Sequence, residues 1–96
     1  MLVRNQGKFL KGKNMNLQIL YNQELENSIG VGYTASKKIG NAIKRNKAKR
    51  IMRELARKII IKGKTNSYYV LIAKPTLLNE KFKNLLLELE KNINVQ

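Results

Sequence analysis

The chain has 96 residues, 43% of them hydrophobic, which is enough for a single domain over residues 1–96 with a modest core. Twenty Lys and Arg against six acidic residues give a formal net charge of +14. The positive charges of so small a domain repel one another unless a polyanion neutralises them. Nucleic acid is therefore the expected partner, and a small-molecule substrate is not expected. A membrane partner is also disfavoured, because the longest apolar run, 68–73, has only six residues and the start shows no signal-peptide pattern.

Several side chains that carry chemistry are missing from the sequence. It contains no Cys, which excludes disulfides and thiolate metal sites and fits a cytoplasmic protein. It also has no His and no Asp, and phosphodiester cleavage by a protein normally needs an acid and a base or a carboxylate cluster that holds metal ions. We therefore expect no catalytic residue and no metal ligand. The only acids are scattered through polar stretches: Glu24, Glu26, Glu54, Glu80, Glu88 and Glu90.

Three short apolar runs predict the strands of a small sheet. Residues 17–21 (LQILY) and 29–34 (IGVGYT) are separated by a polar segment and are expected to pair as a hairpin. Residues 68–73 (YYVLIA) are rich in aromatic and branched side chains, and Pro75 ends this run. Tyr68 and Tyr69 point to opposite faces of such a strand, so one of them is expected in the core.

Two segments have the three- and four-residue apolar spacing of amphipathic helices. The first is residues 41–62, with Asn41 as the N-terminal cap and Gly63 as the stop. Its apolar residues are Ala48, Ile51, Met52, Leu55, Ala56 and Ile59. The second is residues 78–92, which is expected to bury Phe82, Leu85, Leu86 and Leu89.

The resulting order is strand, strand, helix, strand, helix, which predicts an α+β sandwich with the helices packed on one face of a small sheet. The first helix must connect two strands as a crossover. The pattern of elements does not fix the handedness of that crossover.

Positive charge is concentrated in the middle of the chain. Between Lys37 and Lys64 there are twelve Lys or Arg and one acid, Glu54. At 100° per residue, the helix has its apolar residues on one arc and a basic strip opposite, about 20 Å long. The strip consists of the i, i+4 row Arg45, Lys49, Arg53 and Arg57, with Asn46 and Arg50 beside it. Guanidinium forks match phosphate oxygens, so this pattern favours phosphate binding over a merely solvated face.

Residues 36–54, SKKIGNAIKRNKAKRIMRE, closely resemble the signature SKKxGNAVxRNRxKRxxRE of bacterial ribonuclease P protein components. The match includes small residues that basic composition alone would not produce. Gly32-Tyr33 before the signature, and a late strand followed by Pro and a terminal helix, extend the resemblance to about residues 7–93.

The resemblance implies a fold like the second domain of ribosomal protein S5, with a mixed sheet and a left-handed βαβ crossover. It also implies a division of labour in removing the 5′ leader from precursor tRNA. The RNA subunit holds the catalytic Mg²⁺ and does the chemistry, the protein binds no cofactor alone, and its partners are that catalytic RNA and precursor tRNA. The resemblance assigns contacts with RNA to Lys37, Lys38, Asn41, Arg45, Asn46, Lys47, Lys49, Arg50 and Arg53.

The family also implies a cleft between the sheet and a first helix that accepts the single-stranded leader. Aromatic side chains suit such a cleft because a ring stacks on any base. Tyr33, directly before the signature, is the first candidate, followed by Phe9 and Tyr21.

The sequence departs from the family pattern in two places. Lys47 stands where the family has Arg, which keeps the charge but loses the two-point fork. Family members usually begin with a basic helix that carries a Phe, whereas only residues 1–6 precede Gly7 here. The first helix is therefore expected to be short or truncated.

Three other classes of protein fit parts of the sequence. A ribosomal protein suits the size, charge and fold, but ribosomal proteins of this fold lack the signature. A DNA-binding regulator would need a recognition helix in a helix-turn-helix, whereas the long helix here is bounded by strands. A nuclease that acts alone would need the His and Asp that are absent.

Overall fold

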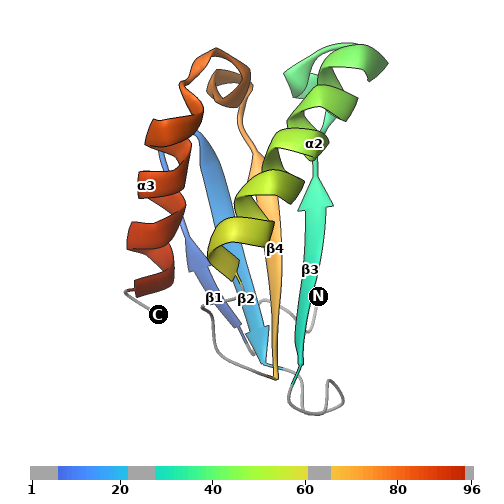
Figure 1. The fold of residues 1–96 in the computed structure, drawn as a ribbon. Helices are drawn as coiled ribbons and strands as arrows, with labels where there is room; N and C mark the ends of the chain where they lie inside the picture. The colour runs from blue at the N-terminus through green and yellow to red at the C-terminus, as the bar shows by residue number, and fades with distance from the viewer. Residues whose placement is uncertain (1–6, 22–27, 61–65, 95–96) are drawn as a thin grey trace.

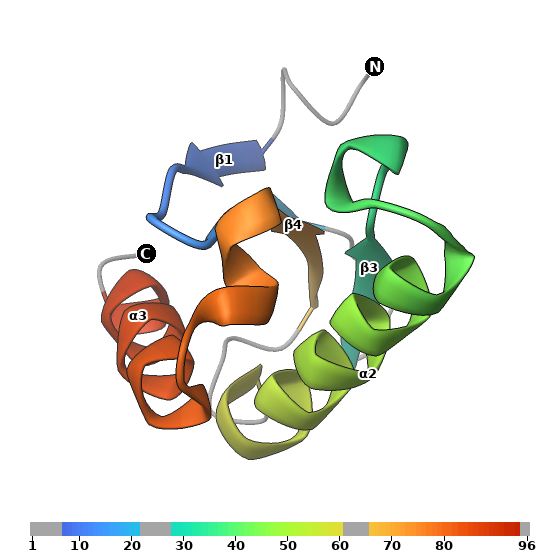
Figure 2. The same ribbon diagram turned by 90° about the horizontal axis from the view of Figure 1, so that it is seen from above.

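The computed structural model describes residues 7–21, 28–60 and 66–94. Its sheet contains β1 (Gly7–Leu10), β2 (Met15–Tyr21), β3 (Ile29–Thr34) and β4 (Ser67–Ala73) in the spatial order β1-β2-β4-β3. The helices α2 (Ala42–Ile59) and α3 (Phe82–Asn94) both cover one face of this sheet (Figures 1 and 2). Short 3₁₀ helices, η2 (Lys37–Ile39) and η4 (Pro75–Asn79), precede α2 and α3. The predicted α+β sandwich is confirmed.

The expected hairpin of residues 17–21 and 29–34 is wrong. β4 lies between these strands, antiparallel to β2 and parallel to β3. The two runs are neighbours in sequence, but each pairs with β4 instead of with the other. This arrangement places β4, the most apolar strand, in the interior of the sheet, with β2 on one edge and β3 on the other. β1, which is antiparallel to β2, is a fourth strand that the apolar pattern does not reveal.

The β3–α2–β4 crossover is left-handed, as the family resemblance implies. In Figure 1, α2 lies in front of the sheet and β4 lies to the left of β3. Since β3 and β4 are parallel, the chain moves leftward across the near face as it passes from one to the other. This hand is rare, because about 98% of such crossovers are right-handed.

Alternation along the strands separates a covered face from an open face. Register places the covered residues opposite one another, for example Leu17 opposite Leu71 and Ile19 opposite Tyr69. These side chains form the core together with the apolar arcs of both helices, and Leu17, Tyr69, Leu71, Met52 and Leu89 are fully buried. Tyr69 is therefore the core tyrosine of its pair, and Tyr68 lies on the opposite face.

The helices begin and end near their predicted bounds. Asn41 caps α2 as expected, since its side-chain oxygen accepts a hydrogen bond from the Lys44 backbone N–H at 3.0 Å. α2 ends at Ile59, and the predicted stop at Gly63 lies outside the described residues. α3 starts at Phe82, later than predicted, because Pro75 initiates the separate 3₁₀ turn η4 before it. The expected short N-terminal helix also falls outside the described residues.

A buried carboxylate contact fastens the β1–β2 turn to α3. The Glu88 carboxylate accepts hydrogen bonds from the backbone N–H and the side-chain amide of Asn14, both at 3.0 Å, and from the Met15 N–H at 3.2 Å. Asn14 is buried, so these donors have little access to water. A Cβ at Gly12 would collide with this carboxylate and with the Met15 carbonyl, which explains the glycine in the turn.

Replacing Glu88 with Gln is expected to lower the free energy of unfolding by about 1–3 kcal/mol, because its NH₂ would replace one of the two carboxylate oxygens that accept hydrogen bonds from Asn14 and Met15. Urea unfolding of the variant measures this loss. Glu54→Gln is the control, since Glu54 makes a surface ion pair with Arg57 and should cost less than about 1 kcal/mol. Equal stability of the two variants would contradict the anchoring role of Glu88.

A second carboxylate, Glu80, lies beside this contact. Hydrogen bonds from the Asn84 side chain and the Lys81 backbone N–H, both at 3.0 Å, lower the pKa of Glu80 below its ordinary value, with smaller contributions from Asn14 and Lys13. A lowered pKa in the folded state means that ionised Glu80 favours folding above its unfolded pKa. This contribution is lost as the pH falls through the lower, folded value.

Candidate nucleic-acid interface

The signature segment forms a tight turn that starts the basic helix. The Ser36 hydroxyl accepts a hydrogen bond from the Lys38 N–H at 3.3 Å, and the Ile39 side chain is buried. Gly40 follows with φ 138° and ψ −151°, a conformation that is essentially restricted to glycine. The small residues of the signature are therefore explained by backbone geometry, and the turn leaves Lys37 and Lys38 exposed at the start of α2.

α2 presents most of its cations to solvent. Seven of its eight basic side chains are exposed: Lys44, Lys47, Lys49, Arg50, Arg53, Arg57 and Lys58. Glu54 is the only acid of the helix, and its carboxylate lies 3.2 Å from the Arg57 guanidinium. Asn46 and Asn41 are exposed on the same helix and at its cap. The predicted RNA-contact residues on α2 thus share one surface, apart from Arg45.

Arg45 is only half-exposed. Its Nε is covered by protein atoms and has no hydrogen-bond partner among the described residues. The i, i+4 row assigns Arg45 to the basic strip, but at 100° per residue it falls between the buried residues Met52 and Ala56, at the packed arc.

Arg53 is held against the sheet. Its guanidinium carbon lies 5.9 Å from the centroid of the Tyr33 ring, within the range of a cation–π contact. Tyr33 lies opposite Leu71 in the register, so it belongs to the covered face and packs against the core.

This placement corrects the first expectation for the leader cleft. Tyr33 faces the helices and supports Arg53, so it does not lie on the open face of the sheet. Tyr21 is exposed at the end of β2, and its register with Ser67 also assigns it to the helix side. Phe9, 49% exposed and opposite Gln18, is the predicted cleft residue that does lie on the open face.

The open face carries a second aromatic side chain, Tyr68. It lies opposite Gly30, and a Cβ on Gly32 would come within 2.7 Å of the Tyr68 hydroxyl oxygen. The ring therefore lies over the part of β3 where Gly30 and Gly32 have no side chains. Leu20, Val70 and Ile72 are half-buried on the same face. Such apolar exposure is typical of a binding surface.

The sequence contains a signal for Tyr68. Gly30 and Gly32 are two residues apart in a strand, so they share one face, and glycine within a strand often marks a close approach by another group. The two glycines identify the face of their strand that carries no side chains. They do not identify the neighbouring strand whose side chain approaches that face.

A model of the family described as Ribonuclease P matches residues 2–95. The chain belongs to the ribonuclease P protein family. The ribonuclease P protein component of Ruegeria pomeroyi is 51% identical over 49 residues, which are 50% of this chain and 39% of that protein. That of Alkaliphilus metalliredigens is 37% identical over 81 residues, 80% of this chain and 72% of that protein.

The aligned segments span less than two thirds of the first curated relatives, with 39% of the Ruegeria protein and 32% of the Caulobacter vibrioides protein. Solved structures agree over nearly the whole chain. The RNase P protein from Thermotoga maritima has a TM-score of 0.84 at 21% identity and covers 99% of this chain and 88% of that one. The Staphylococcus aureus RNase P protein has a TM-score of 0.79 at 22% identity, over 97% and 84%. These structures confirm the fold of the family.

The described residues bring together no group of three or more His, Cys, Asp or Glu side chains that could hold a metal ion. None of the described helices is long and apolar enough to cross a membrane. In the described part of the chain, the candidate surfaces are the cationic surface of α2 and the open face of the sheet.

Proposed function

We propose that the protein is the protein subunit of ribonuclease P, in which it binds the catalytic RNA through α2 and assists removal of the 5′ leader from precursor tRNA. The observation that carries this proposal is the exposed basic surface of α2, with seven exposed cations and one acid that is already paired to Arg57. Like charges along a helix repel one another, and phosphates convert that repulsion into attraction.

The open face of the sheet is proposed as the surface for the single-stranded leader. Phe9 and Tyr68 are partly exposed there, and base stacking on aromatic rings is tolerant of sequence, as processing of many tRNAs requires. The leader surface and the α2 surface lie on opposite sides of the sheet, so one protein can contact two RNAs at once.

The protein is proposed to be the non-catalytic part of this endoribonuclease. Its sequence lacks the His, Asp and Cys residues that protein nucleases commonly use. We assign the chemistry, with its Mg²⁺, to the RNA subunit.

Reconstitution tests the function. The purified protein is mixed with a bacterial ribonuclease P RNA and precursor tRNA at a magnesium concentration too low for the RNA alone. We expect cleavage at the leader junction only when both subunits are present. A basic ribosomal protein of similar size serves as the control for nonspecific charge effects.

Two results would contradict the proposal in different ways. Failure of the protein to stimulate cleavage beyond the ribosomal control would reject its role as the subunit. Cleavage by protein that has been treated with nuclease and repurified would reject the non-catalytic role alone.

A further inference from the structure

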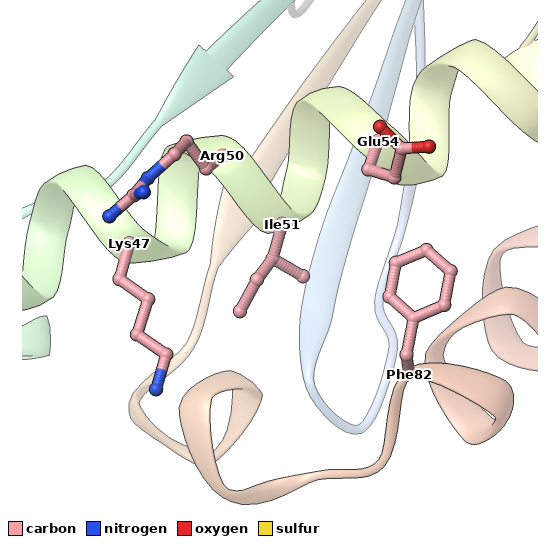
Figure 3. Close-up of a pocket in the computed structure, with 5 residues that line it drawn as sticks. All are labelled: Lys47, Arg50, Ile51, Glu54 and Phe82. Carbon is pink, nitrogen blue, oxygen red and sulfur yellow. The ribbon is translucent and has the colours of Figure 1, made fainter.

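A surface hollow separates α2 from the start of α3. It is open to solvent, has a volume of about 380 Å³, and is lined by Lys47, Arg50, Ile51, Glu54 and Phe82. In Figure 3, Ile51 from α2 and Phe82 from the start of α3 both project into the space between the two elements, and the Phe82 ring lies below Glu54. We call this feature the Phe82 notch.

The lining of the Phe82 notch combines two chemistries. Ile51 and Phe82 are half-buried apolar side chains whose free surfaces form the wall and floor. Lys47 and Arg50 are exposed cations at one end, and the Glu54 carboxylate lies at the other. A nucleotide has the same division, with a base that stacks on an aromatic ring and a phosphate that binds cations.

A second hollow lies near the start of α2. It has a volume of about 310 Å³ and shares Lys47 with the Phe82 notch. Its lining otherwise comes from the start of α2 and from η4: Ile39, Lys44, Pro75, Leu78 and Asn79. Lys47 therefore borders both hollows, where its ammonium group can attract a phosphate.

The polarity of the Phe82 notch fixes how a nucleotide would lie. Glu54 repels a phosphate at its end, and its carboxylate is held there by Arg57 at 3.2 Å. The phosphate therefore belongs at Lys47 and Arg50, and the base belongs against Phe82 and Ile51.

Simple packing does not account for the whole arrangement. Phe82 packs partly against the core, which explains an apolar residue at this position. It does not explain why the rest of the ring borders a hollow beside two cations on the helix that carries the greatest positive charge. That charge favours RNA over a protein as the occupant.

We propose that the Phe82 notch binds one unpaired nucleotide of the catalytic RNA, with its base against Phe82 and Ile51 and its phosphate at Lys47 and Arg50. This proposal rests on the proposed function of α2 as the RNA-contacting helix. The protein would then recognise an unpaired nucleotide that is turned out of its RNA helix, in addition to the charge of the phosphates.

The test compares Phe82→Leu, which keeps apolar bulk, with Phe82→Tyr, which keeps the ring. The probe is a bacterial ribonuclease P RNA whose 2′-hydroxyl reactivity is mapped with and without each protein. The wild-type protein should protect one unpaired nucleotide in addition to its broader footprint. Phe82→Leu should abolish that protection and weaken RNA affinity roughly 5- to 100-fold, whereas Phe82→Tyr should keep both.

Lys47→Gln provides a second variant whose exposed position leaves folding unaffected. It should expose the same nucleotide as Phe82→Leu does. Lys58→Gln removes the same charge from α2 outside both hollows and should leave that nucleotide protected.

The outcomes separate this proposal from the proposed function. If the broad footprint persists and no unpaired nucleotide responds to Phe82→Leu or Lys47→Gln, the Phe82 notch does not bind RNA, although α2 does. If the wild-type protein leaves no footprint on the RNA, the proposed function itself fails.

Discussion

Replacing Lys49 and Arg53 with Glu is expected to weaken binding of the catalytic RNA by roughly 10²- to 10⁴-fold. Both side chains are exposed one turn apart on α2 and outside the Phe82 notch. Each substitution removes a charge-assisted hydrogen bond of about 1.5–3 kcal/mol, and tenfold in affinity corresponds to about 1.4 kcal/mol. Titration of labelled RNA at several salt concentrations measures the effect. The slope of log K against log salt should also become shallower by about 0.7–0.9 for each phosphate that the variant no longer neutralises.

The matched control is Lys83→Glu/Lys91→Glu. These two lysines are exposed on α3, and their reversal lowers the net charge by the same amount. RNA affinity should change far less in this variant. If both variants weaken binding equally, the protein attracts RNA through its total charge and α2 is not a specific docking surface.

Replacing Phe9 and Tyr68 with Leu is expected to weaken binding of precursor tRNA only when its leader is several nucleotides long. Leu preserves apolar surface but removes the rings, and stacking of one base on a ring is worth up to about 1–3 kcal/mol. Precursor affinity is measured in the assembled holoenzyme with leaders of about one and of several nucleotides. Assembly with the catalytic RNA should remain normal, because α2 lies on the other side of the sheet.

Tyr21→Leu is the control for this second prediction, since Tyr21 is 60% exposed but has the register of the helix-covered face. It should bind long and short leaders like the wild type. Equal weakening of both substrates by Phe9→Leu/Tyr68→Leu would show that the open face does not bind the leader.

The local chemistry of the basic segment could be predicted from the sequence. Asn41 begins α2 as its side chain dictates, and the apolar spacing from Ala48 to Ile59 identifies the buried arc. Both depend on interactions within a few residues, which periodicity and capping preferences describe directly. The exposed cations follow from the same wheel. Arg45 is an exception because its position on the wheel lies between Met52 and Ala56, which are buried.

Local patterns in the sequence do not predict which strands pair. They also do not predict which face of the sheet each side chain occupies. A shift of one residue in register reverses every side chain of a strand, so Tyr33 and Tyr68 could exchange roles without any change in composition. Insertion of β4 between β2 and β3 decided both positions. The Phe82 notch likewise joins residues about thirty positions apart through the approach of two helices.

The sequence by itself determined the basic helix, its cap and the family, because these depend on local conformation and on a contiguous signature. Only the tertiary structure decided the strand order and which aromatic side chains lie on the open face of the sheet. These depend on contacts between distant segments, which are selected by burial of the whole apolar surface rather than by the preferences of any one segment.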